Sequence, residues 1–218
     1  MAYQVFLIYG ALVWVVYLAT DGFQNNAPFI FTIPVIVLGI LTFSTHMPKR
    51  KKALTSLSFF MLVTALYHWS VFPKKLELSG LMICASHITY LFSFYRSLRK
   101  WWTGLALITL PAMALFLYAI FEDIFRSLPI LVTILCLTIF ILSFSFVASG
   151  SVWKNGSMSK YEEKTALVRF VGMFFLLVCN SALLINHFAS HTKAVVLYLN
   201  FTYYISQYLL FESNVAAF

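Results

Sequence analysis

Long apolar runs separated by short polar clusters make up almost the whole sequence, and their lengths predict eight membrane-spanning helices. A helix needs about 20 mostly apolar residues to cross a bilayer, and clusters of charge or proline divide the chain into eight such runs. We therefore expect an all-α integral membrane protein, a bundle of about eight transmembrane helices. The predicted helices cover residues 3–20, 28–45, 53–72, 78–96, 101–121, 128–149, 165–187 and 193–213.

The composition excludes a soluble domain. Hydrophobic residues make up 61% of the 218 residues and charged residues only 10%, whereas soluble domains carry roughly 25% charged residues. No Pro/Gly-rich linker interrupts the chain, so residues 1–218 are expected to form a single polytopic membrane domain. The first apolar run lacks a basic region and a small-residue cleavage site, which favours a retained helix over a removed signal peptide.

The three cysteines predict neither a disulfide framework nor a metal site. Cys84, Cys136 and Cys179 lie singly in apolar runs and form no Cys-x-x-Cys pair. Such cysteines usually pack as small hydrophobic residues. We therefore expect no metal and no other cofactor.

Basic residues collect in alternate loops and predict the orientation. The second, fourth and sixth loops contain "PKRKK" (48–52), "RSLRK" (96–100) and three lysines within residues 154–164, and the odd loops contain only four basic residues. Cytoplasmic loops carry an excess of Lys and Arg, so the even loops and both termini are expected in the cytoplasm. The net charge of +8 then reflects topology and anionic lipid headgroups, not nucleic-acid binding. In this topology the glycosylation sequence "NGS" (155–157) stays unmodified, and "NFT" (200–202) is unreachable inside a helix.

A few polar side chains lie deep in the predicted spans, where they are costly in lipid. No Asp or Glu lies at comparable depth. At about 1.5 Å per residue, His68, Asn180, His87 and Tyr203 lie about 6, 10, 15 and 16 Å from the face shared by the third and seventh loops. These side chains are therefore predicted to meet in one pocket in the non-cytoplasmic half. The simpler interpretation is that each one only hydrogen-bonds a neighbouring helix, contributing about 0.6 kcal/mol.

Helical spacing adds neighbours to this polar group. Tyr90 follows His87 by three residues, and Gln207 follows Tyr203 by four, so each pair shares one helix face. Arg169 lies close to the cytoplasmic end of its predicted helix, where its guanidinium is expected to extend to the interface.

Three segments carry a resemblance to a known family. "CNSALLINHF" (179–188) resembles the seventh-helix motif of the YhhN-like lysoplasmalogenases, with Phe188 eight residues after Asn180. "TYYISQYLL" (202–210) is similar to that family's last helix, and "GLMICASHITYLFSF" (80–94) to its fourth. The resemblance covers roughly residues 55–213. It implies an eight-helix enzyme of the endoplasmic reticulum or another intracellular membrane that hydrolyses the vinyl ether bond of lysoplasmalogens, in contact with membrane lipids.

The chain departs from that family at both of its aspartates. Asn180 stands in place of the Ser-Asp aspartate, and "MLVTALYHWSVF" (61–72) has no Gly-Asp, its nearest residues being Tyr67 and His68. Vinyl ether hydrolysis needs a general acid, a group that balances the oxocarbenium ion and a held water molecule. An imidazole titrates near neutrality and could donate the proton, although burial without a carboxylate favours its neutral form. The expected catalytic residues are His68, His87 and Asn180, and the expected substrate-binding residues are Tyr67, Tyr90, Tyr203 and Gln207.

Three alternatives stay open at this point. The first is a catalytically inactive homologue that binds lysophospholipids in the same cavity. The second is a zinc-dependent membrane hydrolase, since Thr64-xxx-His68 and "HFASH" (187–191) are superficially similar to the alkaline ceramidase-like families. A transporter is the third, but the sequence contains no inverted repeat or paired broken helices.

Overall fold

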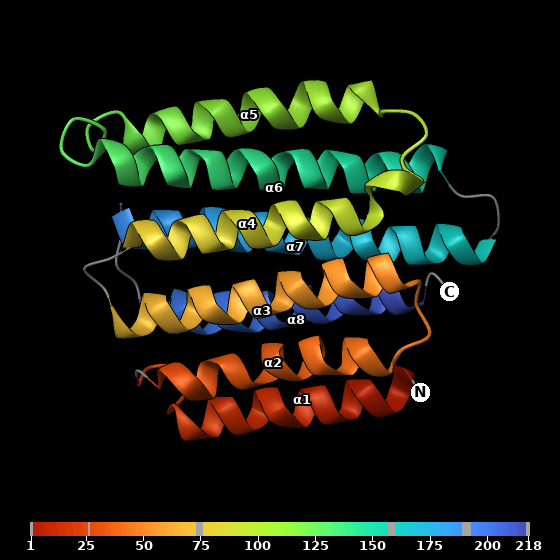
Figure 1. The fold of residues 1–218 in the computed structure, drawn as a ribbon. Coiled ribbons are helices and arrows are strands. Elements are labelled where there is room, and N and C mark those ends of the chain that lie inside the picture. Colours follow the sequence, from red (N-terminus) through yellow and green to blue (C-terminus); the bar gives the residue numbers. More distant parts are fainter. Residues whose placement is uncertain (1, 26, 73–75, 157–159, 189–192, 217–218) are drawn as a thin grey trace.

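The computed structural model describes residues 2–25, 27–72, 76–156, 160–188 and 193–216, and these residues form eight α-helices and one short 3₁₀ helix (Figure 1). The described chain contains no strand, so the predicted all-α fold is confirmed. The elements are α1 (Ala2–Ala19), α2 (Pro28–Ser44), α3 (Lys49–Val71), α4 (Leu76–Phe94), η1 (Tyr95–Ser97), α5 (Thr103–Phe121), α6 (Pro129–Asn155), α7 (Lys160–Phe188) and α8 (Lys193–Val215).

Several helices extend beyond their predicted apolar runs at the basic end of the bundle. α3 starts at Lys49, directly after Pro48, so most of the "PKRKK" cluster is helical. α6 continues to Asn155 and α7 already begins at Lys160, where the apolar pattern predicted ends at 149 and a start at 165. A helix can continue into the polar interface because its backbone hydrogen bonds are internal. The acidic residues Glu162 and Glu163 also lie in the first turn of α7, where they stabilise the positive helix terminus.

The protein is a multi-pass integral membrane protein. By length and composition, α3, α4, α5, α6 and α7 are each long and apolar enough to cross a membrane. α1 and α2 are apolar but shorter, at about 25 Å. α8 is long enough, but amides, hydroxyls and tyrosines interrupt its apolar surface. Both termini lie at the same end of the bundle (Figure 1), as an even number of helices requires; which side of the membrane that end faces stays a prediction.

Two helical hairpins form the centre of the bundle. α3 packs along α4, and α7 packs along α8, while α6 bridges α4 and α7. α1 and α2 cover one side of this centre, and α5 lies outermost on the other, against α6 (Figure 1). The side chains of α5 that point away from α6 are largely exposed, for example Leu107 at 75% and Ile108 at 73%. These surfaces are suited to lipid rather than water.

Small residues allow the helices to approach closely. Ser58 on α3 and Ser86 on α4 each donate a hydroxyl hydrogen bond to the other's carbonyl oxygen, at 3.0 and 2.8 Å. At Gly150 on α6, an added Cβ would lie 2.6 Å from Leu105 Cδ2 and 2.8 Å from Phe170 Cε2, so only glycine fits without movement. Close contacts at small residues are a main source of helix association in membranes.

Arg169 is buried inside the bundle, at 3% exposure, so the prediction that it extends to the interface is wrong. Its Nη2 donates to the Ser213 carbonyl oxygen at 3.0 Å and to Asn214 Oδ1 at 3.2 Å, and its guanidinium lies 4.9 Å from the Phe94 ring centroid. α4 ends at Phe94 and α8 ends at Val215. The cation is retained in the interior because two helix C-termini, with their partial negative charge, meet there.

Candidate functional site

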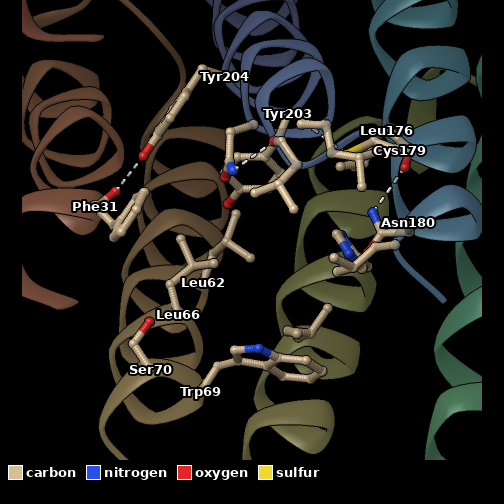
Figure 2. Close-up of a pocket in the computed structure, with 16 residues that line it drawn as sticks. Phe31, Leu62, Leu66, Trp69, Ser70, Leu176, Cys179, Asn180, Tyr203 and Tyr204 are labelled. Carbon is tan, nitrogen blue, oxygen red and sulfur yellow. Dashed lines mark hydrogen bonds between the residues drawn. The ribbon is translucent and has the colours of Figure 1, made fainter. Parts of the chain in front are cut away.

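A partly enclosed cavity of about 210 Å³ lies between the α3–α4 and α7–α8 hairpins, and we call it the pocket (Figure 2). It lies in the half of the bundle where α3 and α7 end and α4 and α8 begin, away from the chain termini (Figure 1). Its walls are mostly apolar. The lining residues are Phe31, Leu62, Leu66, Trp69, Ser70, Ile83, His87, Leu176, Cys179, Asn180, Leu183, Val196, Leu199, Asn200, Tyr203 and Tyr204.

Two of the polar side chains of the pocket have atoms without a hydrogen-bond partner in the described part of the chain. They are Nε2 of His87, whose side chain is only 4% exposed, and the hydroxyl of Tyr203. The neighbouring Tyr204 differs, because its hydroxyl points away to the Phe31 carbonyl oxygen and donates to it at 2.8 Å (Figure 2). A buried polar atom without a partner costs about 1–3 kcal/mol. His87 and Tyr203 therefore have unused hydrogen-bonding capacity where a ligand would lie.

Asn180 and Asn200 add two amide groups to the pocket at the same depth. Asn180 Nδ2 donates to the Leu176 carbonyl oxygen at 2.8 Å, and Asn200 Nδ2 donates to the Val196 carbonyl oxygen at 2.9 Å. Both bonds return to the preceding turn of the same helix, so they fix the two side chains. The thiol of Cys179 donates to the Leu199 carbonyl oxygen at 3.2 Å, which sets the register of α7 against α8. Asn180 and Asn200 directly follow this bonded pair in the sequence, and both line the pocket.

Of the residues expected from the sequence, the structure brings His87, Asn180 and Tyr203 together in the pocket. His68 lies outside it, with its ring against Tyr67 and Phe72, and Tyr67 is 42% exposed. The next residues along α3, Trp69 and Ser70, line the pocket instead. A helix rotates by about 100° per residue, so a difference of one position changes the face.

The other two expected binding residues lie deeper in the bundle, beyond the pocket. The Tyr90 hydroxyl donates to the Leu210 carbonyl oxygen at 2.9 Å and lies 3.3 Å from the Ser213 hydroxyl. Gln207 is 2% exposed, and its Nε2 has no partner among the described residues. Both residues share a helix face with a pocket residue, as predicted from spacing, but lie about one turn further from the pocket end.

The pocket is electrically neutral apart from its imidazole. Its lining contains no aspartate or glutamate. Within the described residues, no three His, Cys, Asp or Glu side chains come together as a metal site. Of the residues that suggested zinc, Thr64 is exposed and donates its hydroxyl to the Phe60 carbonyl oxygen, and His191 lies outside the described residues. The side chains present are suited to hydrogen bonding and to proton transfer at His87.

Several polar or aromatic lining residues were not expected from the sequence, among them Trp69, Ser70, Cys179 and Asn200. Asn200 could have been found, because it lies about 10 Å along α8 from its start, a depth similar to that of Asn180. Because Asn200 begins the glycosylation sequence "NFT", it was considered only as a glycosylation site and not as a polar group of the pocket. Trp69 lies near the end of α3, where tryptophan usually marks the membrane interface, so its position alone did not indicate a pocket.

Comparisons with known proteins give one match. A sequence model described as the YhhN family matches residues 31–214, which extends the resemblance seen in the sequence back into α2. Neither the curated proteins nor the solved structures contain a match to this chain.

Proposed function

The chain belongs to the YhhN family, and on that premise we propose that it is a lysoplasmalogenase-like membrane protein. In this proposal the pocket binds the alkenyl chain of a lysoplasmalogen and the vinyl ether bond is hydrolysed beside His87. The observation that carries the proposal is the unpartnered His87 Nε2 in a mostly apolar pocket. We expect the protein in the endoplasmic reticulum or another intracellular membrane.

The size and walls of the pocket support an apolar, single-chain ligand. A buried apolar cavity of about 150 Å³ is known to bind a benzene ring, and this pocket holds about 210 Å³. Leucine, isoleucine and valine make up seven of the sixteen lining residues, and the polar groups lie among them. Ligand sites commonly combine apolar walls with a small number of polar groups that orient the ligand.

The chemistry of the bond assigns a role to the imidazole. The proton from Nε2 of a protonated His87 is transferred to the β-carbon of the vinyl ether, and the α-carbon becomes an oxocarbenium ion. A water molecule adds to the α-carbon and loses a proton, and the resulting hemiacetal breaks down to a fatty aldehyde and the glycerol hydroxyl. General acid catalysis of this kind contributes about 10²–10⁴-fold. The oxygens of Asn180 and Tyr203 supply partial negative charge near the cation, in place of a carboxylate.

A second candidate function is binding of lysophospholipids without hydrolysis. One observation favours it: the lining contains no carboxyl group to balance the oxocarbenium ion. Amide and hydroxyl oxygens carry only partial charges, so the same pocket would bind the lipid while accelerating its cleavage little.

Purified protein and a 1-alkenyl lysophosphocholine separate the two functions. Release of fatty aldehyde is expected from the wild-type protein, and His87→Leu should lower the rate at least 100-fold. His68→Leu is the matched control, because His68 lies on the same side of the bundle but outside the pocket. Saturable lipid binding with no aldehyde would establish the second function. Turnover that depends on His68 and not on His87 would show that this pocket is not the reaction site.

A further inference from the structure

Three buried polar atoms without a partner lie at the inner end of the pocket. Nε2 of His87, the hydroxyl of Tyr203 and Nε2 of Gln207 bond no other group in the described part of the chain. His87 and Tyr203 line the pocket, and Gln207 follows Tyr203 by one turn on the same face of α8. Buried polar atoms that lack a protein partner are commonly satisfied by an ordered water molecule.

The contact of Tyr90 with α8 shows which residues of the two helices lie at the same level. α4 and α8 run in the same direction, and both begin at the pocket end of the bundle (Figure 1). The Tyr90 hydroxyl on α4 donates to the Leu210 carbonyl oxygen on α8 at 2.9 Å. His87 precedes Tyr90 by three residues, and Gln207 lies the same number of residues before Leu210. His87 and Gln207 are therefore each one turn nearer the pocket than this contact, and Tyr203 is one turn nearer again.

One water molecule matches the hydrogen-bonding properties of all three atoms. Nε2 of the Gln207 amide only donates, whereas Nε2 of a neutral His87 with its proton on Nδ1 accepts. The hydroxyl oxygen of Tyr203 also accepts. A water molecule between them donates its two hydrogens to His87 and Tyr203 and accepts from Gln207. One lone pair of the water then remains free.

We propose that His87, Tyr203 and Gln207 hold the water molecule that hydrolyses the lipid, with Gln207 as its positioning residue. The inference rests on the proposed hydrolysis, and it adds the binding site of the nucleophile and the acceptor of its proton. Once His87 has given its proton to the β-carbon, Nε2 is a base beside the water. The free lone pair forms the C–O bond at the α-carbon, one O–H bond of the water breaks, and that proton passes to Nε2. The imidazolium is thereby restored for the next substrate molecule.

A crystal structure at a resolution that shows ordered water tests this site without reference to turnover. In the wild-type protein, one water molecule should lie within hydrogen-bond distance of all three atoms. Gln207→Met keeps a side chain of similar length without a donor, so this water should be lost. Ser145→Ala is the matched control and should keep the water. The Ser145 hydroxyl is also buried without a partner among the described residues, but it lies on α6, outside the pocket lining.

The rate of aldehyde release tests the role of the water. Gln207→Met should lower kcat roughly 100-fold, because the nucleophile is no longer fixed. Its KM should stay unchanged, since Gln207 is not part of the pocket lining, and Ser145→Ala should change neither constant. The absence of water between the three atoms in the wild-type protein, or an unchanged kcat in Gln207→Met, would overturn the inference and leave the hydrolysis intact. A wild-type protein that holds the water but releases no aldehyde would refute the proposed hydrolysis, while the water site stands.

Discussion

Replacing Arg169 with methionine should destabilise the protein, although it removes a buried charge. The variant no longer has to desolvate the Arg169 guanidinium, which favours its folding. Replacing buried ionic groups by apolar ones is often neutral or stabilising when all partners are replaced together. Here the partners remain. The Ser213 carbonyl oxygen and Asn214 Oδ1 both accept from Nη2, and methionine donates to neither of them.

The loss of folding stability in Arg169→Met can be worked out from those two acceptors. Each buried acceptor left without its donor costs about 1–3 kcal/mol, so the pair costs roughly 2–6 kcal/mol before the relief from desolvation is subtracted. The cation–π contact with Phe94 is lost as well. We expect a net loss of about 2–4 kcal/mol, which for a chain of this size lowers the Tm by roughly 5–15 °C.

The protein contains its own reporters for the assay. Cys84, Cys136 and Cys179 are free thiols, and the first and last are buried, so a thiol-reactive fluorophore follows thermal unfolding. The exposed Arg96→Met is the matched control and should leave the Tm unchanged. In a double-mutant cycle, Arg169→Met and Asn214→Leu should be less than additive, because they remove the same hydrogen bond. A Tm for Arg169→Met at or above that of the wild type would falsify this reasoning.

Four further predictions follow from the site and the packing. Gly150→Ala should cost about 1–3 kcal/mol of stability by overpacking, whereas Gly10→Ala, where nothing lies within 4 Å of the new Cβ, should not lower the Tm. If His87 is the proton donor, the initial rate of aldehyde release should rise about tenfold for each pH unit of acidification until the imidazole is fully protonated, and a rate independent of pH would contradict this role. Asn180→Asp should raise the hydrolysis rate by adding a carboxylate beside the oxocarbenium ion, and an unchanged or lower rate would argue against that placement. Asn155, whose Nδ2 donates to the Lys100 carbonyl oxygen, should carry no glycan in mammalian cells, and a mass shift removed by glycosidase would reverse the predicted orientation.

The fold was largely predictable because run length alone determines how many helices a membrane chain can form. The helix ends at the basic face were not, since the polar residues within 150–155 and 160–164 neither require nor forbid a helix outside the apolar layer. The burial of Arg169 was also unpredictable. It depends on the ends of α4 and α8 meeting in space, which no local pattern encodes.

The site was predictable in part, for a geometrical reason. Depth along a helix follows from counting residues, and that count placed Asn180, His87 and Tyr203 in the same half of the bundle where they line the pocket. The direction of a side chain does not follow from counting when apolar residues do not mark one face of the helix. α3 is of this kind, so the sequence could not distinguish His68 from Trp69, although only Trp69 faces the pocket.

The pocket draws its walls from Phe31 near one end of the chain and Tyr204 near the other. The first four helices therefore supply only one side of the cavity, and α7 and α8 supply the other. A chain that ends before α8 is expected to lose the enclosed pocket, because α8 supplies Leu199, Asn200 and Tyr203 to its wall. Before the α7–α8 hairpin packs in place, the pocket is open beside His87, so docking of this hairpin is the step that completes the site.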